Sequence, residues 1–164
     1  MKFNLLRPKK IYNSLVEIPL DDLLRTGIRG MIIDLDNTLT EWRNPVISQK
    51  TVTWLELAKS MGFQVCFVSN NSTMRVQEVA QKVGVPFVAR AQKPRRWSFM
   101  CALEIMGTRA EETAVIGDQI FTDVLGGNRA GLYTILVTPI SKREFFGTRL
   151  VRLLERLILR VDLF

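Results

Sequence analysis

Four aspartates follow apolar segments of this 164-residue chain at spacings suited to a shared site. Asp34 and Asp36 end one apolar segment, and residues two apart on an extended chain point to the same side. Asp118 and Asp123 follow a second apolar segment. Two like charges about 4 Å apart repel by roughly 4 kcal/mol at an effective dielectric constant near 20, so grouped carboxylates need a cation among them. Because oxygen donors without Cys or His select a hard ion, we expect Mg²⁺ as the cofactor.

A hydroxyl, an amide and a lysine stand at matching places after two other apolar segments. Ser69 and Asn70 lead into a predicted helix, whose N-terminus is suited to phosphate oxygens. Lys93 precedes the next predicted helix. Such a set predicts phosphoryl transfer, in which positioning and charge neutralisation carry most of the catalysis. In such a site one aspartate can attack phosphorus, and a carboxylate two residues on can exchange a proton with the leaving oxygen.

The elements that must position these residues are predicted to be alternating strands and helices. The apolar segments are short, nearly continuous and rich in β-branched residues, which is typical of parallel strands covered on both faces. Helical patterns fill the gaps between them and end at glycines. The predicted strands are 30–35, 64–69, 85–88, 114–117 and 133–137, and the predicted helices are 51–61, 73–83, 95–106 and 123–130. We therefore expect an α/β fold, a Rossmann-like parallel sheet with helices on both faces, in a single domain over residues 1–164. Ligands of such sheets bind at the carboxyl ends of the strands, where the polar residues above are placed.

These motifs resemble those of a known enzyme family. The set is similar, in order and in context, to the four motifs of the haloacid dehalogenase superfamily of phosphatases. The motifs are Asp34-x-Asp36-x-Thr38, Ser69, Lys93 and Gly117-Asp118-x₄-Asp123. More narrowly, residues 34–39, 68–71 and 116–129 look like the YqeG family of subclass IIIA phosphatases, and the resemblance extends to the phosphatidylglycerophosphate phosphatases of mitochondria and plastids. It runs from about residue 8 to residue 160.

The resemblance implies a role for each motif residue. Asp34 would be the nucleophile and a Mg²⁺ ligand, and Asp36 would be the general acid and base, with its backbone carbonyl on the metal. Ser69 and Asn70 would bind phosphoryl oxygens, and Lys93 would neutralise the transferring group. Asp118 would bind the metal directly, whereas Asp123 would complete the metal's shell through water or orient Lys93.

The gaps between the motifs are too short for an inserted cap domain, so we expect a capless, open site. In the resembling family such sites are covered by a large substrate or by a neighbouring subunit of a homo-oligomer. Trp42 and Arg43, just after the first motif, fit either a turn with a packed aromatic ring or a small flap that touches the leaving group.

Composition excludes several other kinds of site. The chain has no histidine, which excludes histidine-based triads, and its two cysteines, Cys66 and Cys101, form no CxxC motif for zinc or redox chemistry. The sequence shows no membrane span and no secretory signal, so we expect a cytoplasmic protein. The formal net charge of +7 favours an anionic partner.

Residues 143–160 predict a basic amphipathic helix. Arg149, Arg152, Arg156 and Arg160 form one stripe, opposite a leucine-rich face. One interpretation is a helix docked on the sheet or on a partner chain. The other is a helix on an anionic membrane surface, where four arginines at about 1 kcal/mol each would give reversible, peripheral binding at the inner membrane face.

The favoured function is Mg²⁺-dependent hydrolysis of a phosphomonoester through an aspartyl-phosphate on Asp34. The resemblance and the basic helix together favour a phospholipid headgroup, phosphatidylglycerophosphate, as the phosphorylated substrate. A soluble metabolite and a nucleic-acid end are the alternatives, although nucleic acid is not favoured because the aromatic residues show no stacking pattern. A receiver-like binding domain without turnover is the remaining alternative.

Overall fold

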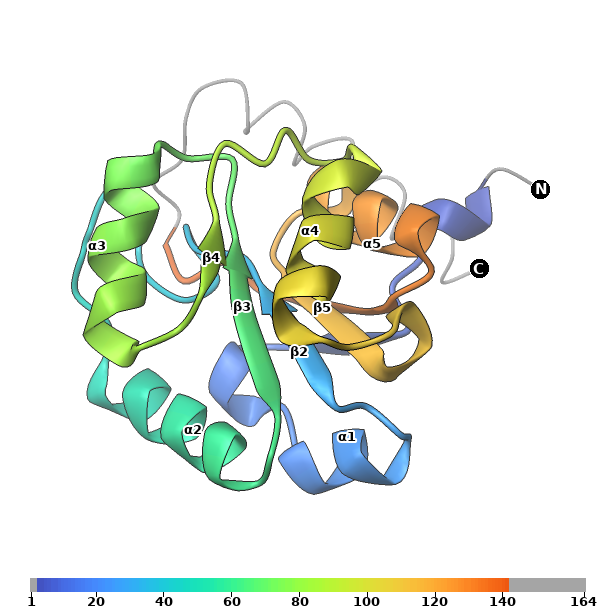
Figure 1. Ribbon diagram of the computed structural model, residues 1–164, viewed down its shortest axis with the longest axis horizontal. Helices are drawn as coiled ribbons and strands as arrows, with labels where there is room; N and C mark the ends of the chain where they lie inside the picture. The colour runs from blue at the N-terminus through green and yellow to red at the C-terminus, as the bar shows by residue number, and fades with distance from the viewer. Residues whose placement is uncertain (1–2, 142–164) are drawn as a thin grey trace.

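The structure, a computed structural model, describes residues 3–141, which form a six-stranded parallel sheet with helices on both faces (Figure 1). The strand order is β1-β6-β5-β2-β3-β4, so that β2 lies between β5 and β3. The strands are β1 (Lys10–Tyr12), β2 (Gly30–Ile33), β3 (Gln64–Val68), β4 (Phe87–Val88), β5 (Thr113–Gly117) and β6 (Tyr133–Val137). Every residue of β2 and β5 is buried, which agrees with the continuous apolar segments expected of central parallel strands.

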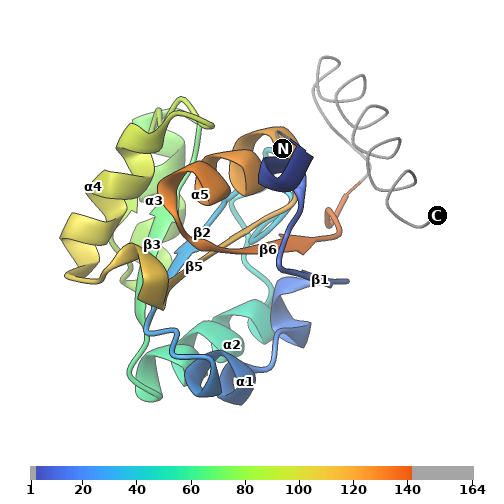
Figure 2. The ribbon, with the colours of Figure 1, turned by 90° about the vertical axis from the view of Figure 1, so that its right-hand side faces the viewer.

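Five α-helices cover the described sheet on its two faces. They are α1 (Leu20–Arg25), α2 (Gln49–Ser60), α3 (Thr73–Val83), α4 (Arg96–Met106) and α5 (Leu125–Ala130). Side chains from α1, α2 and α3 pack with one face of the sheet, and side chains from α4 and α5 pack with the other. Figure 2 shows α1 and α2 on the opposite side of the sheet from α4 and α5. Short helical turns occur at Phe3–Leu6, Leu15–Glu17, Ala110–Glu112 and Ile120–Val124.

The predicted α/β architecture is confirmed, and the differences lie at its margins. The edge strand β1 and the short helix α1 were not expected, because three and six residues are too few to show a clear hydrophobic period. Helix α2 begins at Gln49 rather than 51, where the Ser48 side chain accepts a hydrogen bond from the Thr51 N–H and caps the helix. The predicted helix at 143–160 lies outside the described residues.

The connections between the first strands are short. Between β2 and β3 the chain runs through the loop 34–48 and α2, and between β3 and β4 it contains α3. Neither connection holds a cap domain, which confirms the capless expectation. The carboxyl ends of β2, β3 and β5 are therefore left accessible at one edge of the sheet.

Candidate active site

The residues predicted for the site come together at this carboxyl edge. A cavity of about 510 Å³ opens here, and its lining includes Asp34, Asp36, Trp42, Ser69, Asn70 and Lys93. Asp118 and Asp123 are buried next to these residues: Asp118 contacts Thr38, and Asp123 contacts Lys93. Parallel strands bring these segments together because all their carboxyl ends meet at the same edge.

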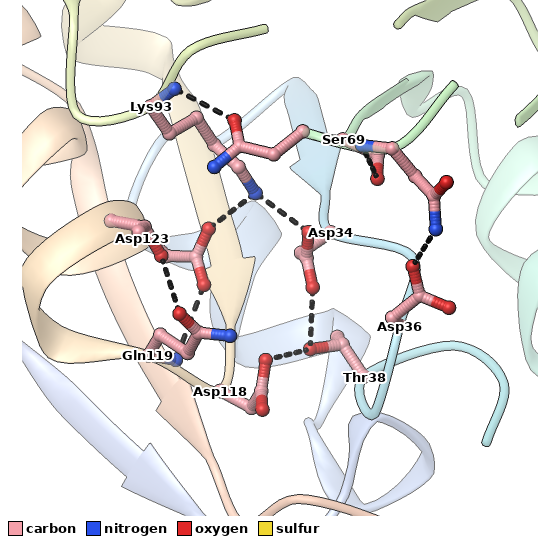
Figure 3. Close-up of polar contacts among 11 residues, drawn as sticks. Asp34, Asp36, Thr38, Ser69, Lys93, Asp118, Gln119 and Asp123 are labelled. Carbon is pink, nitrogen blue, oxygen red and sulfur yellow. Dashed lines mark hydrogen bonds and ion pairs between the residues drawn. The ribbon is translucent and has the colours of Figure 1, made fainter. Parts of the chain in front are cut away.

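Lys93 joins two of the aspartates (Figure 3). Its Nζ lies 2.6 Å from Asp34 Oδ1 and 2.6 Å from Asp123 Oδ1. The Lys93 side chain is 3% exposed and that of Asp123 is 2% exposed, so this is a buried ion-pair triad. Asp123 is therefore in contact with Lys93, as an orienting role would require.

Gly117 makes room for Asp123. A β-carbon at Gly117 would overlap the Asp123 carboxyl group, so only glycine allows the aspartate to lie against the end of β5. The π-helical turn Ile120–Val124 carries Asp123 back toward the strand, and the Gln119 N–H donates to Asp123 Oδ2 at 3.2 Å. The spacing between Asp118 and Asp123 thus spans one such turn.

Asp118 and Thr38 are buried beside Asp34. The Thr38 hydroxyl lies 3.2 Å from Asp118 Oδ1 and 3.5 Å from Asp34 Oδ2, and all three side chains are buried. One carboxylate oxygen from each of Asp34, Asp118 and Asp123 lies within 4.8 Å of the other two. Carboxylates this close fit the oxygen donors that Mg²⁺ prefers.

The charge of this cluster supports a divalent cation. When ionised, three buried carboxylates with one lysine carry a net charge of −2. Burying such an excess of charge is costly unless a counter-ion lies among the groups. The donor set of Asp34, Asp118 and Asp123 therefore fits a divalent cation.

The pKa shifts of Asp34 and Lys93 reflect the same excess of buried negative charge. Burial raises the pKa of Asp34 well above its ordinary value, Lys93 lowers it, and the charges of Asp123 and Asp118 raise it further. Burial by itself would lower the pKa of Lys93, but the charges of Asp123 and Asp34, with their hydrogen bonds, outweigh burial and raise it. Lys93 is thus held as a cation, while the anionic form of Asp34 is disfavoured.

Asp36 lies apart from the three-carboxylate cluster. The sequence predicted Asp34 and Asp36 on the same side of one strand, but β2 ends at Ile33 and both residues belong to the loop that follows. Asn37 in this loop has a left-handed backbone, with φ of 62°, and the chain turns there. Asp36 consequently contacts Asn71 and Arg75, while its side chain still lines the same cavity as Asp34.

Ser69 and Asn70 stand where the sequence placed them, at the end of β3. The Ser69 hydroxyl oxygen accepts from the Asn71 N–H at 3.1 Å, so its own O–H is available to the cavity that it lines. Asn70 Oδ1 accepts from the Lys93 backbone N–H at 2.7 Å and ties the end of β3 to the lysine. Asn70 therefore also helps to place Lys93.

The positions or contacts of three residues near the cavity were not foreseen from the sequence. Gln119 lines the cavity, although the sequence assigned it no role. Asn71 and Arg75 donate to Asp36, and Arg75 comes from α3. A signal for Arg75 was present: a cation in the first turn of a helix opposes the helix dipole and calls for a nearby anion.

Trp42 and Arg43 are now placed at the rim. Trp42 lines the cavity, and the Arg43 guanidinium carbon lies 4.4 Å from the centre of the Trp42 ring. A cation over an indole face is favourable by about 0.5–1 kcal/mol at an exposed site. This arrangement favours the interpretation of a flap beside the cavity.

Comparisons with known proteins agree with this geometry. Family models described as haloacid dehalogenase-like hydrolase and HAD-hydrolase-like match residues 31–92 and 90–143. The chain is 41% identical over 152 residues to "Probable phosphatase YqeG" of Bacillus subtilis, covering 93% of this chain and 88% of that protein. The chain belongs to the haloacid dehalogenase family of phosphatases.

Two further proteins resemble the chain at lower identity. It is 28% identical over 148 residues to "Phosphatidylglycerophosphate phosphatase 1, chloroplastic/mitochondrial" of Arabidopsis thaliana, over 84% of this chain and 42% of that protein. The haloacid dehalogenase fold is shared with the deoxy-D-mannose-octulosonate 8-phosphate phosphatase of Haemophilus influenzae. That match has a TM-score of 0.57 at 17% identity and covers 82% of this chain and 89% of the other. Within the described residues of this family member, no helix is both long and apolar enough to span a bilayer.

Proposed function

We propose that the protein is a Mg²⁺-dependent phosphatase that hydrolyses phosphatidylglycerophosphate through an aspartyl-phosphate on Asp34. The observation that carries the chemistry is the buried bridge from Lys93 Nζ to Asp34 and Asp123, at 2.6 Å each, beside a third carboxylate in an open cavity. Lys93 holds the nucleophile in place and supplies positive charge where a phosphoryl group would lie.

Asp34, Asp118 and Asp123 would hold Mg²⁺, with the Asp36 backbone carbonyl as the further ligand that the resemblance implies. When bound, the ion supplies a Lewis acid that neutralises phosphoryl charge and favours the ionised form of Asp34. It thereby resolves the conflict that raises the Asp34 pKa in the metal-free cluster.

The reaction then needs two displacements at phosphorus. In the first, an Asp34 carboxylate oxygen forms a bond to phosphorus, the ester P–O bond breaks, and the leaving oxygen takes the proton of Asp36. In the second, water attacks the same phosphorus, Asp36 accepts a proton from the water, and the Asp34–phosphorus bond breaks to release inorganic phosphate. Ser69 and Asn70 would donate to the phosphoryl oxygens throughout.

Three observations support a lipid headgroup as the substrate. The Arabidopsis relative bears the name of a phosphatidylglycerophosphate phosphatase. The net charge of +7 favours an anionic surface, and the capless site leaves room for a substrate that is part of a larger assembly. We propose that the protein works in this way at the cytoplasmic face of a membrane.

The test is Mg²⁺-dependent release of inorganic phosphate from vesicles that carry phosphatidylglycerophosphate. A panel of soluble esters, including a nucleoside monophosphate and glycerol phosphate, is run beside it. We expect turnover of the lipid at least about ten-fold above any soluble ester, and its loss in Asp34→Asn, because the amide is not a nucleophile. Asp21→Asn, an exposed carboxylate on α1, is the matched control and should keep full activity.

The possible outcomes separate the two parts of the proposal. Equal or faster turnover of a soluble ester would reject the lipid and keep the chemistry. A stable aspartyl-phosphate without release of phosphate would reject the hydrolase and favour a receiver-like domain.

A further inference from the structure

Arg75 reaches from α3 to the loop that follows β2. Its Nη2 lies 3.1 Å from Asp36 Oδ1, 2.8 Å from the Asn44 backbone oxygen and 3.4 Å from Thr40 Oγ1. The Arg75 side chain is 13% exposed and that of Asp36 is 18% exposed. One guanidinium therefore holds the carboxyl group and the loop that carries it.

The position of Arg75 is unfavourable for α3 itself. It is the third residue of the helix, where the positive end of the helix dipole disfavours a cation. Its Nε is buried and has no hydrogen-bond partner among the described residues. A residue that is unfavourable for its own helix and has an unpaired buried donor, and that lies beside a site, points to a functional reason for its presence.

Asn71 holds the other oxygen of Asp36. The Asn71 Nδ2 donates to Asp36 Oδ2 at 2.8 Å. The Asn71 backbone oxygen accepts from the Arg90 N–H, and the Asn71 Oδ1 accepts from the Ser72 N–H. Asn71 is thus anchored on both sides. Each carboxylate oxygen of Asp36 has its own donor, and the two donors come from different segments of the chain.

We propose that Arg75, together with Asn71, is a positioning residue that aims Asp36 at the leaving-group oxygen. This inference rests on the proposed function, in which Asp36 gives its proton to that oxygen. Asp36 lies in a loop rather than on a strand, so the backbone alone leaves its side chain several rotamers. The two donors select one rotamer, and the contacts of Arg75 with Thr40 and Asn44 fix the loop on which that rotamer depends.

A series of leaving groups tests this role. Nitrophenolate leaves without protonation, whereas an alkoxide needs a proton from the acid. The measured quantity is kcat/KM, because it reports only the steps up to departure of the leaving group. For Arg75→Met we expect a loss of about 10- to 100-fold with glycerol phosphate and at most about three-fold with p-nitrophenyl phosphate, since a positioned general acid contributes about 10²- to 10⁴-fold. Arg75→Lys should recover part of the loss, and Asn71→Ala should show the same selectivity.

Lys82→Met is the matched control. Lys82 lies on the same helix and donates to the Pro45 backbone oxygen at 2.9 Å, so it links α3 to the same loop without touching Asp36. It should change neither ester by more than about two-fold, as expected for an exposed contact. In an Asp36→Asn background, Arg75→Met should cause no further loss with glycerol phosphate, because the group that it positions is already absent.

Three results would overturn the role of Arg75. They are equal losses on both esters, the same selectivity from Lys82→Met, and full additivity with Asp36→Asn. Circular dichroism checks that each variant is folded. If Arg75→Met does not fold, Arg75→Lys is measured in its place. If the parent protein hydrolyses no ester, the proposed function itself fails. If the parent is active and Arg75→Met has the same activity, only the role of Arg75 fails.

Discussion

In the proposed reaction Asp34 attacks phosphorus as an anion, yet it lies buried beside two other carboxylates, with Lys93 as the one lysine in contact among residues 3–141. That conflict is a property of the metal-free protein. In the proposed mechanism one group would serve both as nucleophile and as metal ligand, because a bound cation would also offset the repulsion among the carboxylates.

This conflict predicts that Asp34→Asn stabilises the metal-free protein. Because the folded-state pKa of Asp34 is raised, its contribution to stability is full below the unfolded pKa of about 3.9 and is lost as pH rises through the folded pKa. At pH 7 the carboxyl group therefore costs folding free energy, and the neutral amide removes that cost. We expect a Tm about 2–4 °C higher for each kcal/mol removed, measured by calorimetry in EDTA.

Magnesium should reverse this order. The ion should raise the Tm of the parent protein and raise that of Asp34→Asn less, since a ligand that binds only the folded state stabilises it by mass action. Asp21→Asn is again the control, and Mg²⁺ should raise its Tm as much as that of the parent protein. A lower Tm for Asp34→Asn in EDTA would contradict the electrostatic account.

Gly117 supports a second prediction at the scale of single residues. In Gly117→Ala the new methyl group displaces the Asp123 carboxyl group, and with it Lys93. We expect a loss in kcat/KM of about 10²-fold, the size of effect that a displacement near 1 Å can cause, together with a smaller Mg²⁺-induced rise in Tm. Gly30→Ala is the control: its methyl group would crowd the Thr108 and Thr113 side chains at the other end of β2, so it should lower Tm and leave the Mg²⁺ response intact. Equal Mg²⁺ responses in the parent and Gly117→Ala would contradict this view.

At the scale of elements, the site is built from the ends of strands and helices. Helices α2 and α3 both begin at a serine, but only Ser48 accepts a hydrogen bond through its side chain, from the Thr51 N–H. Ser48→Ala should therefore lower the free energy of unfolding by about 1 kcal/mol, whereas Ser72→Ala should change it by less than about 0.5 kcal/mol. Urea unfolding followed by circular dichroism measures both, and equal losses would show that the cap geometry does not decide the effect.

The strands and helices around the site were predictable from hydrophobic period, and their margins were not. The run 30–35 was expected to be one strand, yet β2 ends at Ile33. The Asp34 N–H still donates to the Ile116 oxygen of β5 at 2.9 Å, but Asp36 lies in the loop beyond. Alternation along a sequence cannot show where strand pairing ends, since pairing depends on the neighbouring strands. For the same reason the pattern did not reveal that Asp36 turns toward α3.

At the scale of the whole molecule, the net charge of +7 should govern approach to an anionic surface. Raising NaCl from about 50 mM to about 500 mM shortens the Debye length and should lower turnover on phosphatidylglycerophosphate vesicles several-fold. Turnover of glycerol phosphate should fall by less than about two-fold, because one small ester in the cavity senses only nearby groups. The same salt dependence on both substrates would indicate that the surface charge does not recruit the protein to vesicles.

The chain by itself determined the α/β fold, the strand ends that carry the motifs, and the identities of Asp34, Asp36, Lys93, Asp118 and Asp123 as candidates. Apolar period and residue type are local properties, so they can be read along the sequence. Only the tertiary structure decided which charges meet: Lys93 with Asp34 and Asp123, and Asp36 with Arg75. Such pairs join residues that are 30 or more positions apart, and their geometry depends on how the loops at one sheet edge pack together.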